Sequence, residues 1–404
     1  MNSISDRQRL VVVGASVRSA AQRANLLGID VVAIDQFGDR DLKAIAQVHS
    51  LQSLFDRGDL SWCKGDGCQT ALLLCGGMEN RSETIQRLIG HGLVCGLTPE
   101  TLSELRAPEF WARWANDSGV FWPETSCNAP NGPQISNDGD HQRRDAWLVK
   151  SRTSAGGLGV RVWKGEACES FEYLQRSVAG DVLGVTFVNL GEKSHLVGCM
   201  RSWTNGEYWG PSPFIYRGNV GPVRLEIDEQ IRLTEFANRV REASGLRGVW
   251  QADFVRNQAG WWLLEINPRW SSSMELLEVI YDISLVALHM TAVLGITESK
   301  ISPIDWNEHS ARCARQTSPV IGKVVRYASY DLCPDQSMLD RWWDARWDGT
   351  VSSLLEKNRL ADIPGDASMI LKGYPICTEF AIGNSVAEIT ERLQQSVIDQ
   401  DLRF

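Results

Sequence analysis

Four polar residues in the second half of the chain could together hold a metal ion and a phosphate. Asp253 lies in one apolar run, and Glu265, Asn267 and Arg269 close the next. Residues two apart on a strand share a face, so an antiparallel neighbour could add Asp253 to the face of Glu265 and Asn267. Three oxygen donors suit Mg²⁺, and Arg269 could grip a phosphate or stabilise charge on a transferred group. The alternative is an edge-strand acid in a structural salt bridge.

A lysine and a glycine-rich turn precede these residues in the chain. Lys150 ends a predicted strand, and the turn after it contains Ser154, Gly156, Gly157 and Gly159. Glycines let backbone N–H groups surround phosphate oxygens, and a lysine adds positive charge against the same phosphates. The turn lies between hairpin strands, so it is neither a Walker-type loop nor a dinucleotide fingerprint. A simple hairpin turn with an exposed lysine is the alternative.

Several residues at predicted strand ends are candidate substrate ligands. The turn that contains Gly14, Ser16 and Arg18 joins a strand to a helix, where free N–H groups favour an anion. Glu79 follows another strand and could hold an amine, since α/β sheets bind ligands at the carboxyl ends of their strands. The competing interpretation is that these glycines only serve tight turns. Arg201 is a further candidate for catalysis, with a surface ion pair as its alternative.

The patterning of apolar residues predicts the elements that must position these side chains. Residues 1–98 alternate strands with helical stretches, which predicts a parallel sheet with crossover helices. Residues 99–298 begin as helices and continue as strands in hairpins. They divide into a small lobe at about 146–180 and a large lobe at about 181–298.

The end of the chain is predicted to contain less regular structure. Met274–Leu294 reads as one long apolar helix, and residues 299–315 are expected to be irregular. Residues 319–382 give several short strands before a closing helix. The expected fold class is α/β with α+β lobes, and residues 299–404 form a small C-terminal β-rich unit.

Composition excludes some classes of function. The 404 residues carry a net charge of −9 with no basic cluster, which argues against a nucleic-acid binder. No apolar run approaches the roughly 18 residues that cross a bilayer, and no signal peptide is evident, so no membrane partner is expected. The ten cysteines are scattered, as is typical of reduced thiols, so a cytoplasmic location is expected.

The combination of Lys150, the glycine-rich turn, Asp253 and the segment Glu265–Arg269 resembles the ATP-grasp superfamily of carboxylate–amine or carboxylate–thiol ligases. The resemblance covers most of the chain, and the C-terminal unit is similar to that of the biotin-carboxylase-like branch. It implies an ATP-grasp fold with a Rossmann-like first domain and two lobes that clamp ATP.

The resemblance also assigns roles to individual residues. Lys150 and the glycine-rich turn would hold the phosphates of ATP, and Arg269 would stabilise an acyl-phosphate. The three oxygen donors would hold Mg²⁺, with Mn²⁺ as an alternative. Gln175 falls in the hinge near adenine, where the family usually has an acid, and Asp181 falls near the ribose. The family's earlier phosphate lysine is missing, and Arg106 is the nearest cation to its expected position.

A narrower resemblance concerns four short segments. Residues 14–18, 35–39, 76–80 and 361–364 are similar to predicted ATP-grasp proteins associated with tetrahydromethanopterin- and methylofuran-linked one-carbon metabolism. The expected function is therefore a Mg-ATP-dependent ligase that joins a small-molecule acid to an amine. The branch often forms homodimers. A bicarbonate-activating carboxylase-like enzyme and a nucleotide-binding protein with a decayed site are the alternatives.

Overall fold

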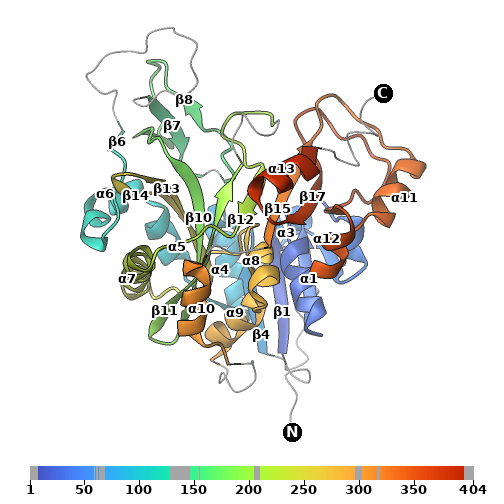
Figure 1. Ribbon diagram of the computed structural model, residues 1–404, viewed down its shortest axis with the longest axis horizontal. Helices are drawn as coiled ribbons and strands as arrows, with labels where there is room; N and C mark the ends of the chain where they lie inside the picture. Colours follow the sequence, from blue (N-terminus) through green and yellow to red (C-terminus); the bar gives the residue numbers. More distant parts are fainter. Residues whose placement is uncertain are drawn as a thin grey trace.

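The computed structural model describes residues 8–58, 60, 62, 69–127, 146–153, 155–203, 210–295, 303–315 and 319–394. Its strands form three sheets of five, eight and four strands (Figure 1). The four-stranded sheet stands at the upper left of Figure 1, and the C-terminal elements lie at the right. The mixed α/β class predicted from the sequence is confirmed.

The first sheet is parallel throughout and has the order β3-β2-β1-β4-β5. Its strands are β1 (Gln8–Gly14), β2 (Asp30–Asp35), β3 (Gln47–Ser50), β4 (Gln69–Leu74) and β5 (Val94–Cys95). The connecting helices are α1 (Arg18–Leu26), α2 (Arg40–Lys43), α3 (Leu51–Arg57), the 3₁₀ turn η3 (Met78–Asn80) and α4 (Ser82–Gly90). The centre of β1 is an unbroken apolar run because both faces of this parallel sheet are covered. The edge strand β3 was not predicted, since its residues are mostly polar.

The four-stranded sheet is antiparallel and has the order β6-β9-β7-β8. Its strands are β6 (Thr125–Ser126), β7 (Trp147–Ser151), β8 (Arg161–Val162) and β9 (Glu172–Arg176). Helices α5 (Pro99–Arg106) and α6 (Pro108–Trp114) and the 3₁₀ turn η4 (Asn116–Ser118) precede it. The predicted glycine-rich turn therefore joins two hairpin strands, β7 and β8, as expected.

The eight-stranded sheet has the order β14-β13-β10-β11-β12-β15-β17-β16. Its strands are β10 (Asp181–Leu190), β11 (Lys193–Ser202), β12 (Gly218–Gly221), β13 (Gly248–Asn257), β14 (Gly260–Asn267), β15 (Val320–Tyr327), β16 (Arg359–Ala361) and β17 (Pro375–Gly383). Strand β12 pairs with β15, so the C-terminal strands extend the sheet of the large lobe. Strands of the large lobe and of the C-terminal unit thus belong to one hydrogen-bonded sheet.

The helices of the second half differ in places from the sequence prediction. They are α7 (Ile227–Ser244), α8 (Met274–Tyr281), α9 (Leu285–Leu294), α10 (Trp306–Ala314), α11 (Gln336–Asp344), α12 (Val351–Glu356) and α13 (Val386–Gln394). The single long helix predicted over Met274–Leu294 is wrong, because α8 and α9 meet at 108°. Asp282 ends α8 in the left-handed region, with φ of 53°. The segment expected to be irregular contains α10, which Asp305 caps.

Within the described residues, no single helix combines the length and apolar character needed to cross a membrane. The bent pair α8–α9 reaches that length and composition only when both helices are taken together. Most of the side chains of α8 and α9 are buried against the sheets.

Candidate active site

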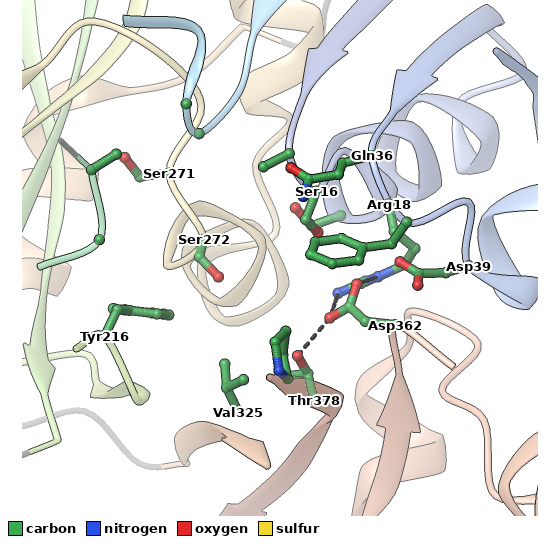
Figure 2. Close-up of a pocket in the computed structure, with 18 of the residues that line it drawn as sticks. Ser16, Arg18, Gln36, Asp39, Tyr216, Ser271, Ser272, Val325, Asp362 and Thr378 are labelled. Atoms are coloured by element: carbon green, nitrogen blue, oxygen red, sulfur yellow. Dashed lines mark hydrogen bonds and ion pairs between the residues drawn. The ribbon is translucent and has the colours of Figure 1, made fainter. Parts of the chain in front are cut away.

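One cavity of about 960 Å³ is lined by segments from all three sheets. The loop after β1 contributes Ser16, the glycine-rich turn contributes Gly156, and β13 and β14 contribute Asp253 and Glu265. Strand β17 contributes Thr378 at the opposite end. Figure 2 shows the part of this cavity where Ser16 and Thr378 face Tyr216 and Ser272 across the open space.

The four polar residues singled out in the sequence come together at one end of the cavity. Asp253 and Glu265 are direct partners across the β13–β14 ladder. The Nδ2 of Asn267 donates to Oδ2 of Asp253 at 2.8 Å and to Oε1 of Glu265 at 3.3 Å. Gln251 donates from Nε2 to the other oxygen of Asp253 at 2.7 Å. These bonds fix both carboxylates at the cavity wall.

Arg269 links this group to the first sheet. Its Nε donates to Oε1 of Glu79 at 2.8 Å, and its Nη2 donates to Oδ1 of Asn267 at 3.0 Å. Its Nη1 donates to Oγ of Ser271 at 3.0 Å. Because Arg269 lines the cavity, the pair with Glu79 aims its guanidinium at the space beside the two carboxylates. Glu79 itself, expected to hold an amine, is paired with Arg269 instead.

The two carboxylates titrate differently because their neighbours differ. Burial, reinforced by the charge of Glu265, raises the pKa of Asp253 to about 7. Burial also opposes ionisation of Glu265, but the charges of Arg106, Lys150 and Arg269 outweigh it and hold the pKa of Glu265 below its ordinary value. Arg106 therefore acts electrostatically on the site, near the position where the family's earlier lysine is expected.

The donor set suits a divalent cation that shares its ligands with a nucleotide. Mg²⁺ is usually held by one or two carboxylates, with phosphate oxygens and water completing its shell. Asp253 and Glu265 provide two carboxylates, and burial together with the charge of Glu265 raises the pKa of Asp253, so a bound cation would favour its ionised form. The described part of the chain holds no group of three or more His, Cys, Asp or Glu side chains arranged for a metal. The oxygen of Asn267 faces Arg269, so its role as a third ligand requires the amide to turn and stays a prediction.

The glycine-rich turn packs against the segment before β12. A Cβ on Gly157, whose φ is +78°, would lie 1.8 Å from the carbonyl oxygen of Phe214, so only glycine fits there. The N–H of Tyr216 donates to the carbonyl of Gly156 at 3.0 Å. Thr153, Ala155, Gly156 and Leu158 line the cavity, and Ser154 lies outside the described residues.

Lys150 lies behind this turn on β7. Burial lowers its pKa, and the charges of Glu265 and Asp253 oppose that shift, which places the ammonium within electrostatic range of both carboxylates. Lys150 does not itself line the cavity, so its contact with bound phosphates stays a prediction.

Three predicted ligands lie apart from this end of the cavity. Gln175 is 1% exposed on β9, and its Nε2 is buried without a hydrogen-bond partner. Asp181 and Arg201 line a second cavity of about 610 Å³, in which Arg256 approaches Asp181 at 3.6 Å. The structure does not bring Asp181 and Arg201 to the carboxylate pair, and their roles remain predictions.

The turn after β1 lies at the other end of the large cavity. Gly14 must be small, because a Cβ there would lie 2.7 Å from the Cβ of Cys75. Ser16 and Arg18 line the cavity, but Arg18 is 2% exposed and pairs with Glu275 at 2.8 Å and Asp362 at 2.9 Å. Arg18, which the sequence suggested as an anion ligand, is thus paired with carboxylates of the protein itself.

Sequence reasoning assigned no role to several cavity residues. Asp39, Asp362 and Thr378 lie at the end that Arg18 shares. Ser271 accepts from Arg269, and the carbonyl of Ser272 accepts from Lys323. Asp39 and Asp362 do fall in the short segments that carry the narrower resemblance. That signal marked these segments without showing which of their side chains would face the cavity.

Comparisons with known proteins agree with this geometry. Residues 121–273, which include the glycine-rich turn, Asp253 and Arg269, match the ATP-grasp domain family. The chain contains an ATP-grasp domain. The predicted ATP-grasp fold with biotin-carboxylase-like relatives is thereby confirmed.

Solved structures extend the likeness to nearly the whole chain. Carboxyaminoimidazole ribonucleotide synthase from Aspergillus clavatus, solved with ATP, is 14% identical with a TM-score of 0.65, over 98% of this chain and 99% of that one. L-amino acid ligase from Bacillus licheniformis is 10% identical with a TM-score of 0.65, over 97% of each chain. Biotin carboxylase from Campylobacter jejuni is 10% identical with a TM-score of 0.62, over 95% of this chain and 89% of that one. At these identities the likeness shows a shared fold.

Proposed function

We propose that the ATP-grasp domain and its flanking units form an ATP-dependent ligase that activates a carboxylate as an acyl-phosphate and joins it to an amine. One observation carries the proposal: Asp253, Glu265 and Arg269 line the same cavity as the glycine-rich turn. Metal-binding acids, a phosphate cradle and a cation for developing charge are the parts that phosphoryl transfer requires. The names of the similar solved structures, an ATP-bound synthase and an L-amino acid ligase among them, support it.

In this mechanism an oxygen of the substrate carboxylate attacks the γ-phosphorus of ATP, and the bond to ADP breaks. The amine nitrogen then attacks the acyl carbon, and the carbon–oxygen bond to phosphate breaks. Lys150 and the N–H groups of the glycine-rich turn hold the phosphates in line, and Arg269 stabilises the negative charge of the acyl-phosphate. Asp253 and Glu265 would hold Mg²⁺ or Mn²⁺, which when bound neutralises phosphate charge.

The narrower resemblance extends the proposal to a pathway. Residues 35–39 and 361–364, two of the segments that carry it, both reach the cavity wall through Asp39 and Asp362. We therefore include a role in building a tetrahydromethanopterin- or methylofuran-type one-carbon cofactor as the finer form of the proposal. A substrate screen that includes pterin and furan precursors tests this form.

The test is ADP formation by the purified chain with candidate acids and amines, in parallel with Glu265→Gln. The variant should lose at least about a hundredfold in turnover, because one of the two carboxylates at the phosphates becomes a neutral amide. Glu192→Gln is the matched control, since the Glu192 side chain is 97% exposed and should be silent. Near-normal turnover in Glu265→Gln, with its unfolding temperature unchanged, would overturn the metal assignment.

The same assay separates the alternatives. ADP release that depends on bicarbonate and on no organic acid indicates the carboxylase-like enzyme, which the likeness to biotin carboxylase supports. Tight ATP binding without ADP formation under any condition indicates a nucleotide-binding protein with a decayed site. Either result would replace the ligase proposal.

A further inference from the structure

Five carboxylates and two cations gather at or behind one end of the large cavity, and three of them, Arg18, Asp39 and Asp362, line it. We call this group the acidic end; it consists of Asp35, Asp39, Asp41, Glu275 and Asp362 with Arg18 and Lys323. Figure 2 shows Asp39, Asp362 and Arg18 side by side at the wall, with Asp362 also bonded to Thr378. Acids outnumber bases here by three, so the group is short of positive charge.

Two of the five carboxylates bind the two cations. Glu275 accepts from Arg18 at 2.8 Å and from Lys323 at 2.6 Å. Asp362 accepts from Nε of Arg18 at 2.9 Å and from Oγ1 of Thr378 at 2.5 Å. Both carboxylates are thereby paired within the protein. Arg18 also approaches Asp41 at 3.8 Å, so its single charge is shared among three acids.

Two more carboxylates are satisfied by the backbone. Asp35 accepts the N–H groups of Val17, Phe37 and Gly38 at 2.7–2.8 Å, which fixes the loop after β2. Asp41 accepts the N–H groups of Asp362 and Ile363 at 2.9 and 3.0 Å, which joins α2 to the segment after β16. These two acids have structural partners and need no ligand.

Asp39 is the exception. The residue lines the cavity and is 6% exposed, and its Oδ2 is buried without a hydrogen-bond partner. Burial and then the charges of Asp362 and Asp41 raise its pKa well above the ordinary value. A carboxylate left in this state reduces stability, so a ligand that supplies both a positive charge and N–H donors would complete the site.

Backbone hydrogen bonds hold Asp39 in place. Its carbonyl accepts the N–H of Lys43 at 3.0 Å in the first turn of α2. The next N–H, of Arg40, donates to the carbonyl of Ile363 at 2.8 Å. These bonds fix the backbone of Asp39 between α2 and the segment after β16.

The chemistry of this end favours an organic ammonium group over a metal ion. A divalent cation needs about six oxygen ligands, and no set of three metal-binding side chains is arranged for one within the described residues. An ammonium group needs only two or three acceptors and one net negative charge. Oxygen-bearing Ser16 and Gln36 also line the cavity near Asp39 (Figure 2).

Apolar side chains on the same wall indicate what the ammonium group is attached to. Phe37, in the loop before Asp39, is 47% exposed, and Met369, after β16, is 63% exposed. Both line the cavity. Large apolar side chains that stay exposed in a cavity commonly contact the apolar part of a ligand.

We propose that Asp39 binds the protonated amino group of a primary amine whose apolar body contacts Phe37 and Met369. The identification of this amine as the acceptor rests on the proposed function, and it requires the ammonium group to give a proton to the carboxylate of Asp39 so that the neutral nitrogen attacks the acyl carbon. The binding site itself does not depend on that function.

The test is titration calorimetry of the full chain, without nucleotide, at a pH where alkylamines are protonated. Phenethylamine should bind, and phenethyl alcohol, which has the same body without the charge, should bind at least tenfold more weakly. Asp39→Asn should lower the affinity for phenethylamine at least tenfold. The matched control is Asp340→Asn, since Asp340 is exposed on α11 beside Arg40 and does not line the cavity; it should bind phenethylamine as the unchanged protein does.

Several outcomes would overturn the proposal. Equal binding of amine and alcohol, or wild-type affinity in Asp39→Asn, would show that no carboxylate recognises the ligand. If ammonium or potassium ions bind as tightly as phenethylamine, the proposed contact of an apolar body with Phe37 and Met369 is wrong. If Asp39→Asn does not fold, Asp39→Glu keeps the charge on a longer side chain and should bind phenethylamine measurably more weakly than the unchanged protein; unchanged affinity there counts against the site.

The proposal and the proposed function can fail separately. If Glu265→Gln abolishes ADP formation but Asp39→Asn leaves the KM for the amine unchanged, only the amine-site proposal is wrong. If amine binding depends on Asp39 but the protein forms no ADP, only the proposed ligase function is wrong.

Discussion

The two ends of the large cavity hold carboxylates in opposite electrostatic surroundings. At the nucleotide end, which we define by Lys150, Asp253, Glu265 and Arg269, cations keep Glu265 ionised and hydrogen bonds from Gln251 and Asn267 orient the acids. At the acidic end, the acids outnumber the cations and Oδ2 of Asp39 is buried without a hydrogen-bond partner. The first arrangement suits a metal-bound polyphosphate and the second a cation. One cavity can offer both because the eight-stranded sheet runs along it and the segments after β1 and β2 of the first sheet add Arg18 and Asp39 at one end.

The largest effect is expected from breaking the acidic end. Arg18→Met removes the partner of two carboxylates and should lower the free energy of unfolding by about 3 to 5 kcal/mol, as loss of one member of a buried ion pair does. Urea denaturation measures this. The control is Arg9→Met, whose partner Asp30 is 57% exposed, and its cost should stay under about 1 kcal/mol. If both variants lose similar amounts of unfolding free energy, the buried ion pairs of Arg18 stabilise the protein no more than the exposed pair of Arg9.

An intermediate effect should be confined to the nucleotide end. Gly157→Ala places a Cβ against the carbonyl of Phe214 and should displace the glycine-rich turn. We therefore expect the KM or Kd for ATP to rise about tenfold, which corresponds to about 1.4 kcal/mol. Gly156→Ala has a similar positive φ but no atom within 4 Å of the new Cβ, so it isolates the cost of backbone strain. Nucleotide titration compares the two. Equal weakening would mean that strain, and not the contact with Phe214, is responsible.

The smallest effect concerns pH. A buried acid whose folded pKa is raised destabilises the protein as pH rises from its unfolded pKa through its folded pKa. Asp39→Asn should therefore match the unchanged protein near pH 4 and become more stable toward pH 7, by about 1 kcal/mol or more. Chemical denaturation at several pH values measures the difference. Saturating phenethylamine should reduce it, and a difference that is flat with pH would contradict the unpartnered carboxylate.

The grouping of Asp253, Glu265 and Asn267 on one face could be predicted from the sequence because the signals are local. Glu265 and Asn267 lie two apart on one strand, and a single hairpin brings Asp253 opposite them, so alternation along the strands was enough. The glycine-rich turn likewise joins adjacent strands. Such short-range geometry follows directly from residue order.

The acidic end could not be predicted in the same way. Arg18 meets Asp362 across 344 positions of sequence, and Lys323 meets Glu275 across 48. No local sequence pattern indicates that these charges are paired. The sequence therefore suggested that Arg18 could bind an anion, and it suggested no role for Asp39. The break between α8 and α9 was missed for a related reason, since apolar periodicity continues through the turn while Asp282 adopts a left-handed conformation.

The pairing of β12 with β15 has a mechanical consequence. The strands that carry Asp253 and Thr378 belong to one continuous ladder, so these two walls cannot separate without rupturing main-chain bonds. The four-stranded sheet shares no ladder with the others in the described part of the chain. Within the same described residues the five-stranded sheet shares no ladder with the other two either, so the walls that carry Ser16 and the glycine-rich turn can shift relative to the eight-stranded sheet without loss of its ladder bonds.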